Sequence, residues 1–107
     1  MKNIPKNYEE MKCESYRHGR AYLTDITHRN YEATNRRGLI TIETTFENFI
    51  DKLKEEVDEL DTKLPYADPD WCELADIALI CFTMAEHYGI DLIEEMRKKT
   101  EFNETRP

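Results

Sequence analysis

The chain has 107 residues with 23 acidic and 15 basic side chains, which gives a formal net charge of −8 at pH 7. This length corresponds to one domain with a modest core, and the negative charge disfavours binding to nucleic acid polymers and to anionic membrane surfaces. The three cysteines have no paired spacing, which argues against a disulfide framework or a zinc site and favours a reducing, cytoplasmic location. No apolar run approaches the roughly 20 residues of a membrane span, and the first residues lack the apolar core of a signal peptide.

Residues 1–38 form a polar segment that is rich in tyrosine and has only loosely helical apolar spacing. Gly19 and the stretch 24–27 leave both one long helix and two shorter helices open, and we expect one long helix. Gly38 is a suitable end, because glycine readily adopts the left-handed conformation that terminates many helices. The stretch 39–42 is β-branched and too short for a helix, so it predicts an extended linker.

A second helix is expected to begin at Thr44, because Thr44 and Glu47 have the spacing of a capping box. It should extend to about Lys63, since apolar residues recur every three or four positions and form one face. These residues are Phe46, Phe49, Ile50, Leu53, Val57, Leu60 and Leu64. Lysines lie among the acids of this helix, so some of its carboxylates should form surface ion pairs of little energetic weight.

A third helix is expected from Pro69 or Trp71 to Tyr88, and its middle is apolar on nearly all sides. A helix of this kind must be covered on several sides. One short chain cannot easily cover it and also form a cleft. We therefore expect a subunit interface at this helix, most simply in a two-fold dimer.

A fourth helix should follow Gly89, because Asp91 and Glu94 have the spacing of another capping box. Three donors at spacings of four and three would line one face of this helix: Lys99, Asn103 and Arg106. Basic residues near the end of a helix are also favoured by its dipole, which is an alternative explanation for their presence.

Two pairs of carboxylates have the spacing of metal ligands. Glu56 and Glu59 share one face of the second helix, and Glu73 and Asp76 repeat this spacing on the third. Glu56 and Asp76 lie beside apolar stretches, where an unpaired buried carboxylate would be strongly destabilising. A divalent ion bound by carboxylate oxygens is the simplest compensation, while capping and surface pairing explain the spacing about as well.

These acids resemble the signature of the MazG-like members of the all-α nucleoside triphosphate pyrophosphohydrolase superfamily. The family pattern of Glu-Glu-x-x-Glu, a spacer and Glu-x-x-Asp is present as Glu55-Glu56-x-x-Glu59 and Glu73-x-x-Asp76. The turn from His87 to Leu92 and the tail from Lys99 to Arg106 resemble the family as well, as does, less specifically, the segment 35–39. The resemblance covers roughly residues 35–106.

The resemblance implies an all-α, four-helix-type bundle, with residues 1–107 as a single domain completed by formation of a homodimer or a dimer of dimers. It also implies Mg²⁺-dependent hydrolysis of a nucleoside triphosphate to the monophosphate and pyrophosphate, in nucleotide-pool housecleaning, with Mn²⁺ as a substitute ion. The implied metal ligands are Glu56, Glu59, Glu73 and Asp76, with Glu55 in a supporting catalytic role. The implied substrate contacts are Lys99, Asn103, Arg106 and Asn35.

Two other functions fit the same residues. One is a non-catalytic helical interaction or regulatory module of the same fold, from which an enzyme would be distinguished by magnesium-dependent release of pyrophosphate. The other is a related pyrophosphatase that acts on a phosphoribosyl nucleotide and differs only in its pocket.

Overall fold

The computed structural model describes residues 8–63 and 71–107, and the side chains of residues 17–61 and 71–107. These residues form four helices and no strand, which confirms the all-α class. The helices are α1 (Tyr8–Arg36), α2 (Phe46–Lys63), α3 (Trp71–His87) and α4 (Leu92–Glu104). Leu64 and Pro69, which the sequence placed at helix ends, lie outside the described residues. None of these helices is long and apolar enough to cross a membrane.

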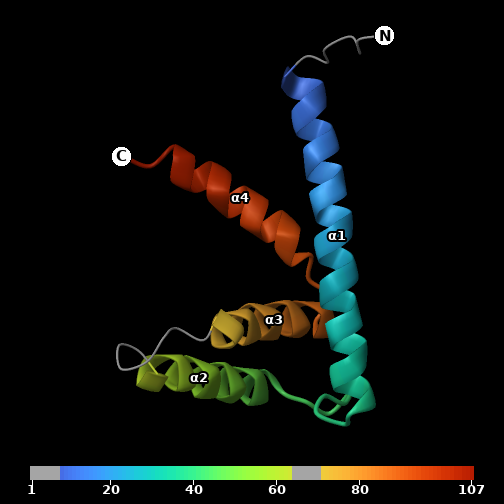
Figure 1. Ribbon diagram of the computed structural model, residues 1–107, viewed down its shortest axis with the longest axis vertical. Coiled ribbons are helices and arrows are strands. Elements are labelled where there is room, and N and C mark those ends of the chain that lie inside the picture. Colours follow the sequence, from blue (N-terminus) through green and yellow to red (C-terminus); the bar gives the residue numbers. More distant parts are fainter. Residues whose placement is uncertain (1–7, 64–70) are drawn as a thin grey trace.

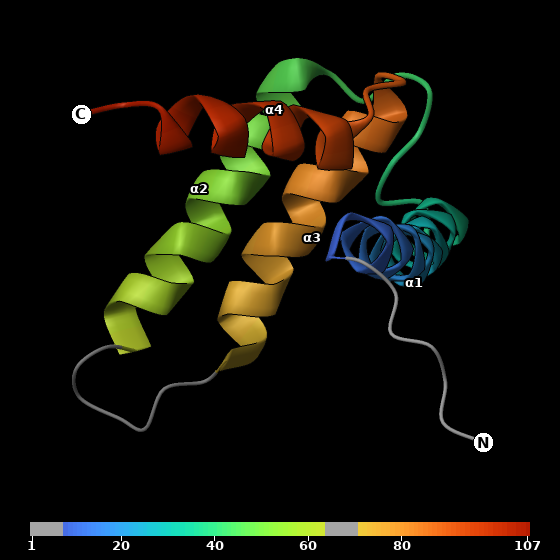
Figure 2. The same cartoon turned by 90° about the horizontal axis from the view of Figure 1, so that it is seen from above.

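The four helices are arranged around α3. Figure 1 shows α1 along the long axis of the molecule, with α2 and α3 side by side near the C-terminal end of α1. Helices α2 and α3 run antiparallel, and α3 contacts each of the other three helices. Figure 2 shows α4 crossing above one end of the α2–α3 pair. Helix α3 therefore links the separate parts of the chain.

Helix α1 is one continuous helix of 29 residues, so Gly19 does not divide it. Its last residue is Arg36, and Gly38 shortly after it has a positive φ of 76°. The amide of Gly38 donates to the Asn35 carbonyl at 2.9 Å, and the amide of Leu39 donates to the Thr34 carbonyl at 3.1 Å. These two bonds form a Schellman motif, in which glycine is favoured because it has no Cβ.

The segment between α1 and α2 is not the extended linker that the sequence predicted. The Thr44 amide donates to the Thr41 carbonyl at 3.0 Å and closes a turn. The Thr44 hydroxyl accepts from the Thr41 amide at 2.9 Å, so Thr44 is engaged in this turn and does not cap the helix. Thr45 and Asn48 cap α2 instead, through reciprocal bonds of 3.2 and 2.9 Å. The predicted capping box of Thr44 and Glu47 was thus wrong by one residue.

The junction between α3 and α4 follows the sequence pattern closely. Gly89 has a positive φ of 68° just after the end of α3. Asp91 is the N-cap of α4, and its carboxylate accepts from the Glu94 amide at 3.1 Å. The Glu94 side chain does not return to Asp91, because it binds Arg97 at 2.6 Å. The cap is therefore present with one of its two expected bonds.

Helix α1 is held to the rest of the chain by polar contacts. Arg20 pairs with Asp91 at the start of α4, and His28 pairs with Glu86 on α3. His28 also contacts Glu32 one turn further along α1. The hydrogen bond and negative charge of Glu86, followed by those of Glu32, raise the pKa of His28 above its ordinary value.

The hydrophobic core is small. Among the described apolar side chains, Ile40, Phe49 and Ala85 are buried, whereas Trp71 is 67% and Ile42 97% exposed. The radius of gyration is 17.7 Å, compared with about 13 Å for a compact domain of this length. One chain by itself therefore leaves considerable apolar surface in contact with solvent.

We predict that the free energy of unfolding falls as the pH rises from about 6.5 through the raised pKa of His28. The protonated imidazole is the form that Glu86 and Glu32 stabilise, so its contribution is complete at lower pH and is lost on deprotonation. Urea denaturation between about pH 6 and pH 8.5 should show a smaller loss for His28→Gln than for the wild type. His18→Gln, at an exposed position on α1, is the matched control. Equal pH dependence in the wild type and His28→Gln would contradict this role.

Candidate metal centre

Two glutamates on α2 and one on α3 form the candidate site. Glu56 continues the apolar face of α2 after Phe49 and Leu53. It is buried there, with 7% of the whole residue exposed. Glu59 lies one turn later and is exposed. Glu73 lies in the first turn of α3 and is 8% exposed. Because the two helices are antiparallel, the second half of α2 lies beside the beginning of α3 (Figure 1).

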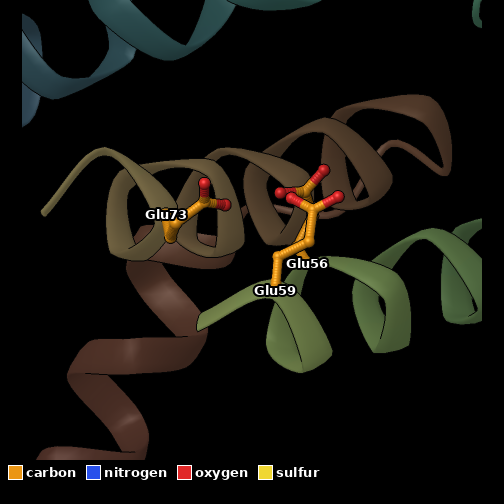
Figure 3. Close-up of side chains that lie close together, drawn as sticks. All are labelled: Glu56, Glu59 and Glu73. Carbon is orange, nitrogen blue, oxygen red and sulfur yellow. The ribbon is translucent and has the colours of Figure 1, made fainter. Parts of the chain in front are cut away.

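The three carboxylates converge. One oxygen each from Glu56, Glu59 and Glu73 lies within 4.8 Å of the others. Figure 3 shows Glu56 and Glu59 close together on α2, with Glu73 directed toward them from α3. A hard divalent cation binds carboxylate oxygens at about 2.0–2.6 Å. Small side-chain rotations would therefore allow one ion to contact all three residues.

The electrostatics of the cluster favour a cation. The pKa of Glu59 is raised, first by its hydrogen bond to Glu73 and then by the negative charge of Glu56. The Oε2 atom of Glu56 is buried and has no hydrogen-bond partner within the described part of the chain. A buried carboxylate oxygen without a donor is costly. A bound divalent ion would provide that oxygen with a partner and remove the repulsion, so these residues fit a metal site.

Asp76 lies beside this cluster. It is exposed and does not belong to the group of three whose oxygens meet. It follows Glu73 by one helical turn, and its side chain is one methylene shorter. Asp76 instead lines a neighbouring cavity together with Glu56. Its role as a metal ligand stays a prediction.

This cavity has a volume of about 540 Å³ and lies against the acid cluster. Residues of α1, the linker, α2 and α3 line it, and Glu56 is common to the cavity and the cluster. Its polar wall includes Arg37, Lys52 and Asn48, and its apolar wall includes Ile40 and Phe49. A pocket of this size with both kinds of wall is typical of small-molecule sites.

Lys52 connects the cavity with the acids. Its ammonium lies 3.3 Å from Glu56 Oε1 and 3.5 Å from Glu55 Oε2. The hydrogen bond to Glu56 raises the pKa of Lys52 and so favours its charged form. Glu55 is largely exposed, and this ion pair is its described contact. The structure thus places Glu55 beside the site and not among the converging oxygens.

The expected substrate contacts do not reach this cavity within one chain. Lys99 and Arg106 lie over the Phe102 ring, at 4.8 and 5.7 Å from its centroid, and Arg106 donates to Asn103 Oδ1 at 3.3 Å. Figure 1 shows α4 leaving the end of α3 and rising away from the α2–α3 pair. Asn35 is exposed at the end of α1 and does not line the cavity. The substrate roles of these four residues stay predictions.

Several polar residues of the cavity, among them Lys52, Asn48 and Arg37, were not assigned to the site from the sequence. Lys52 was expected to form a surface ion pair, and it does pair with an acid four residues later, but that acid is the buried Glu56. Asn48 was not recognised, because the capping box was predicted one residue too early, at Thr44 and Glu47. Arg37 lies in the segment 35–39, for which the resemblance implied Asn35 as the substrate contact, whereas the structure places Arg37 and not Asn35 in the cavity lining.

Comparisons of the chain with protein-family models, with curated proteins and with solved structures find no match.

We predict that Mn²⁺ stabilises the folded protein. An ion that binds only the folded state adds about 2.7 kcal/mol to the free energy of unfolding at a concentration of 100 times its Kd. Urea denaturation with and without Mn²⁺ should show this gain in the wild type and most of it lost in Glu56→Gln. Glu47→Gln removes an exposed acid at the start of α2 and should behave like the wild type. An equal gain in both variants would show that the ion binds elsewhere.

Proposed function

We propose that this protein is a magnesium-dependent nucleoside triphosphate pyrophosphohydrolase of the MazG-like type, which converts the triphosphate to the monophosphate and pyrophosphate. The observation that supports the proposal most directly is the position of the acid cluster at the edge of the cavity, with Glu56 shared by both. A triphosphate in this cavity would lie between a bound cation and the basic residues Arg37 and Lys52.

Hydrolysis adds the oxygen of water to the α phosphorus and breaks the bond from this phosphorus to the bridging oxygen, so that pyrophosphate leaves. Bound magnesium would screen the phosphate charge and lower the pKa of the attacking water. Glu56, Glu59 and Glu73 would hold the ion, with Asp76 at the cavity wall as the fourth ligand. Pyrophosphate would then be the direct product to measure.

The remaining residues of the cavity would bind and orient the substrate. Arg37 can donate two parallel hydrogen bonds to phosphate oxygens, whereas Lys52 acts as a compact point charge. Together with the bound ion, these two cations would offset the repulsion between a triphosphate and a protein with a net charge of −8. Ile40 and Phe49, both buried, form an apolar wall against which a nucleoside could pack.

We predict magnesium-dependent release of pyrophosphate from at least one member of a panel of canonical and modified nucleoside triphosphates. Glu56→Gln should reduce this rate by at least about 100-fold, because loss of one carboxylate ligand removes charge stabilisation in the transition state. Glu47→Gln should retain the wild-type rate. Enzyme-coupled detection of pyrophosphate, with and without Mg²⁺, measures both effects.

The absence of turnover by the folded protein across this panel would contradict the proposal. A non-catalytic interaction module of the same fold would then be favoured. One observation already points toward that alternative, because Lys99, Asn103 and Arg106 contact one another or Phe102 and do not line the cavity.

We propose further that the chain forms a homodimer or homotetramer. Large apolar side chains on all four helices are half or more exposed, among them Tyr22, Phe46, Trp71 and Phe102. Monomeric proteins rarely leave this much apolar surface uncovered relative to their core. A second copy could cover it and extend the small core around Phe49.

We predict that sedimentation velocity at micromolar concentration gives the mass of a dimer or of a larger oligomer, compared with 12.8 kDa for one chain. The apolar surface that one chain exposes supplies the driving force. A single species with the mass of one chain across the concentration range would contradict the proposed oligomer.

A further inference from the structure

Lys52 stands between the acid cluster and the cavity. Its ammonium contacts Glu56 Oε1 at 3.3 Å and Glu55 Oε2 at 3.5 Å, and the same side chain lines the cavity of about 540 Å³. The two carboxylates differ strongly in burial, since the Glu56 side chain is 9% and the Glu55 side chain 62% exposed. Lys52 therefore neutralises a buried acid that also belongs to the candidate metal centre.

A divalent cation at this centre would compete with Lys52 for Glu56. Both are positively charged, and the oxygens of one carboxylate would lie between them, so binding of the ion repels the ammonium. The lysine side chain can move, because it is 54% exposed and has four rotatable methylene groups. The buried Glu56 cannot move as freely, and it also has the orphaned Oε2 atom that an ion would satisfy.

The cavity offers the displaced ammonium a new partner. Lys52 and Arg37 both line it, so an anion bound there would meet two cations. While Lys52 is paired with Glu56, its charge is largely neutralised and contributes little to anion binding. Once an ion has taken Glu56, the full charge of the ammonium becomes available to the cavity.

We propose that Lys52 is an exchangeable counter-ion, which pairs with Glu56 in the metal-free protein and binds a phosphate group of the substrate after a divalent cation has displaced it. This inference rests on the proposed metal-dependent function and assigns to Lys52 a role in the order of binding. The cation binds first and thereby prepares the cavity for the anion. By linkage, the anion in turn strengthens binding of the cation.

The test compares Lys52→Gln with Lys54→Gln. Both substitutions remove one positive charge from α2, but Lys54 is exposed and does not line the cavity. Titration with Mn²⁺ alone, followed by calorimetry or by electron paramagnetic resonance of the free ion, gives the first readout. Lys52→Gln should bind Mn²⁺ at least threefold more tightly than Lys54→Gln, because the competing cation is gone.

The second readout is the affinity for a non-hydrolysable α,β-methylene nucleoside triphosphate. In saturating Mg²⁺, Lys52→Gln should bind this analogue about tenfold more weakly than Lys54→Gln, a change typical of a lost charge-assisted contact. In the presence of a chelator the two variants should bind it equally, because Lys52 is then held by Glu56. A Lys52 that merely stabilised the fold would not produce this dependence on the metal.

Two results would overturn the inference. If the wild type binds Mn²⁺ and the two variants bind it with equal affinity, Lys52 does not compete with the ion, although the metal centre itself stands. If the analogue binds equally to both variants in saturating Mg²⁺, Lys52 does not contact the phosphates. A wild type that binds no Mn²⁺ would instead remove the metal centre and the proposed function together with this role of Lys52.

Discussion

The antiparallel packing of α2 against α3 is the constraint on which the rest of the structure depends. At one end of the pair, the ring of Phe49 packs against the rings of His87 and Tyr88, with centroids 5.2 and 6.2 Å apart. At the other end, the same alignment brings Glu56 and Glu73 together in a largely buried position. The favourable packing of these rings thus helps to hold the two carboxylates close together, although their negative charges repel each other.

His87 also contacts residues outside the α2–α3 pair. Its Nε2 donates to the Thr44 carbonyl at 3.2 Å, and its Nδ1 lies 3.4 Å from the Tyr31 hydroxyl. One imidazole at the end of α3 therefore contacts α1 and the segment that leads into α2. Of its partners, Thr44 also lines the cavity, so this imidazole connects the end of α3 with one part of the cavity wall.

The position of α4 keeps Lys99, Asn103 and Arg106 away from the acid cluster, although the family resemblance assigned both groups to one site. Asp91 caps α4 and pairs with Arg20, so the start of this helix is tied to α1. The helix then leads away from the α2–α3 pair (Figure 1). Lys99 on α4 and Arg106 just beyond its end lie over the Phe102 ring. Among the described residues of one chain, the cations that line the cavity together with Glu56 are Lys52 and Arg37, which come from α2 and from the turn after α1.

The sequence by itself determined the features that depend on neighbouring residues. It indicated the all-α class, the ends of helices at Gly38 and Gly89 and the cap at Asp91, because periodicity, glycine and short polar side chains act within one or two helical turns. It also identified three acids that meet in space, since Glu56 and Glu59 share a helical face and Glu73 begins the next helix.

Only the tertiary structure decided how these local features combine. The packing of α2 against α3 brings Glu73 into the cluster and leaves Asp76 at the cavity wall, although both have suitable spacing. The turn after α1 is formed by local hydrogen bonds, but only the packing of the helices shows that Arg37 lines the same cavity as Glu56 and Asp76. The sequence does not indicate these placements, because they depend on the relative orientation of whole helices and not on the spacing of residues within one helix.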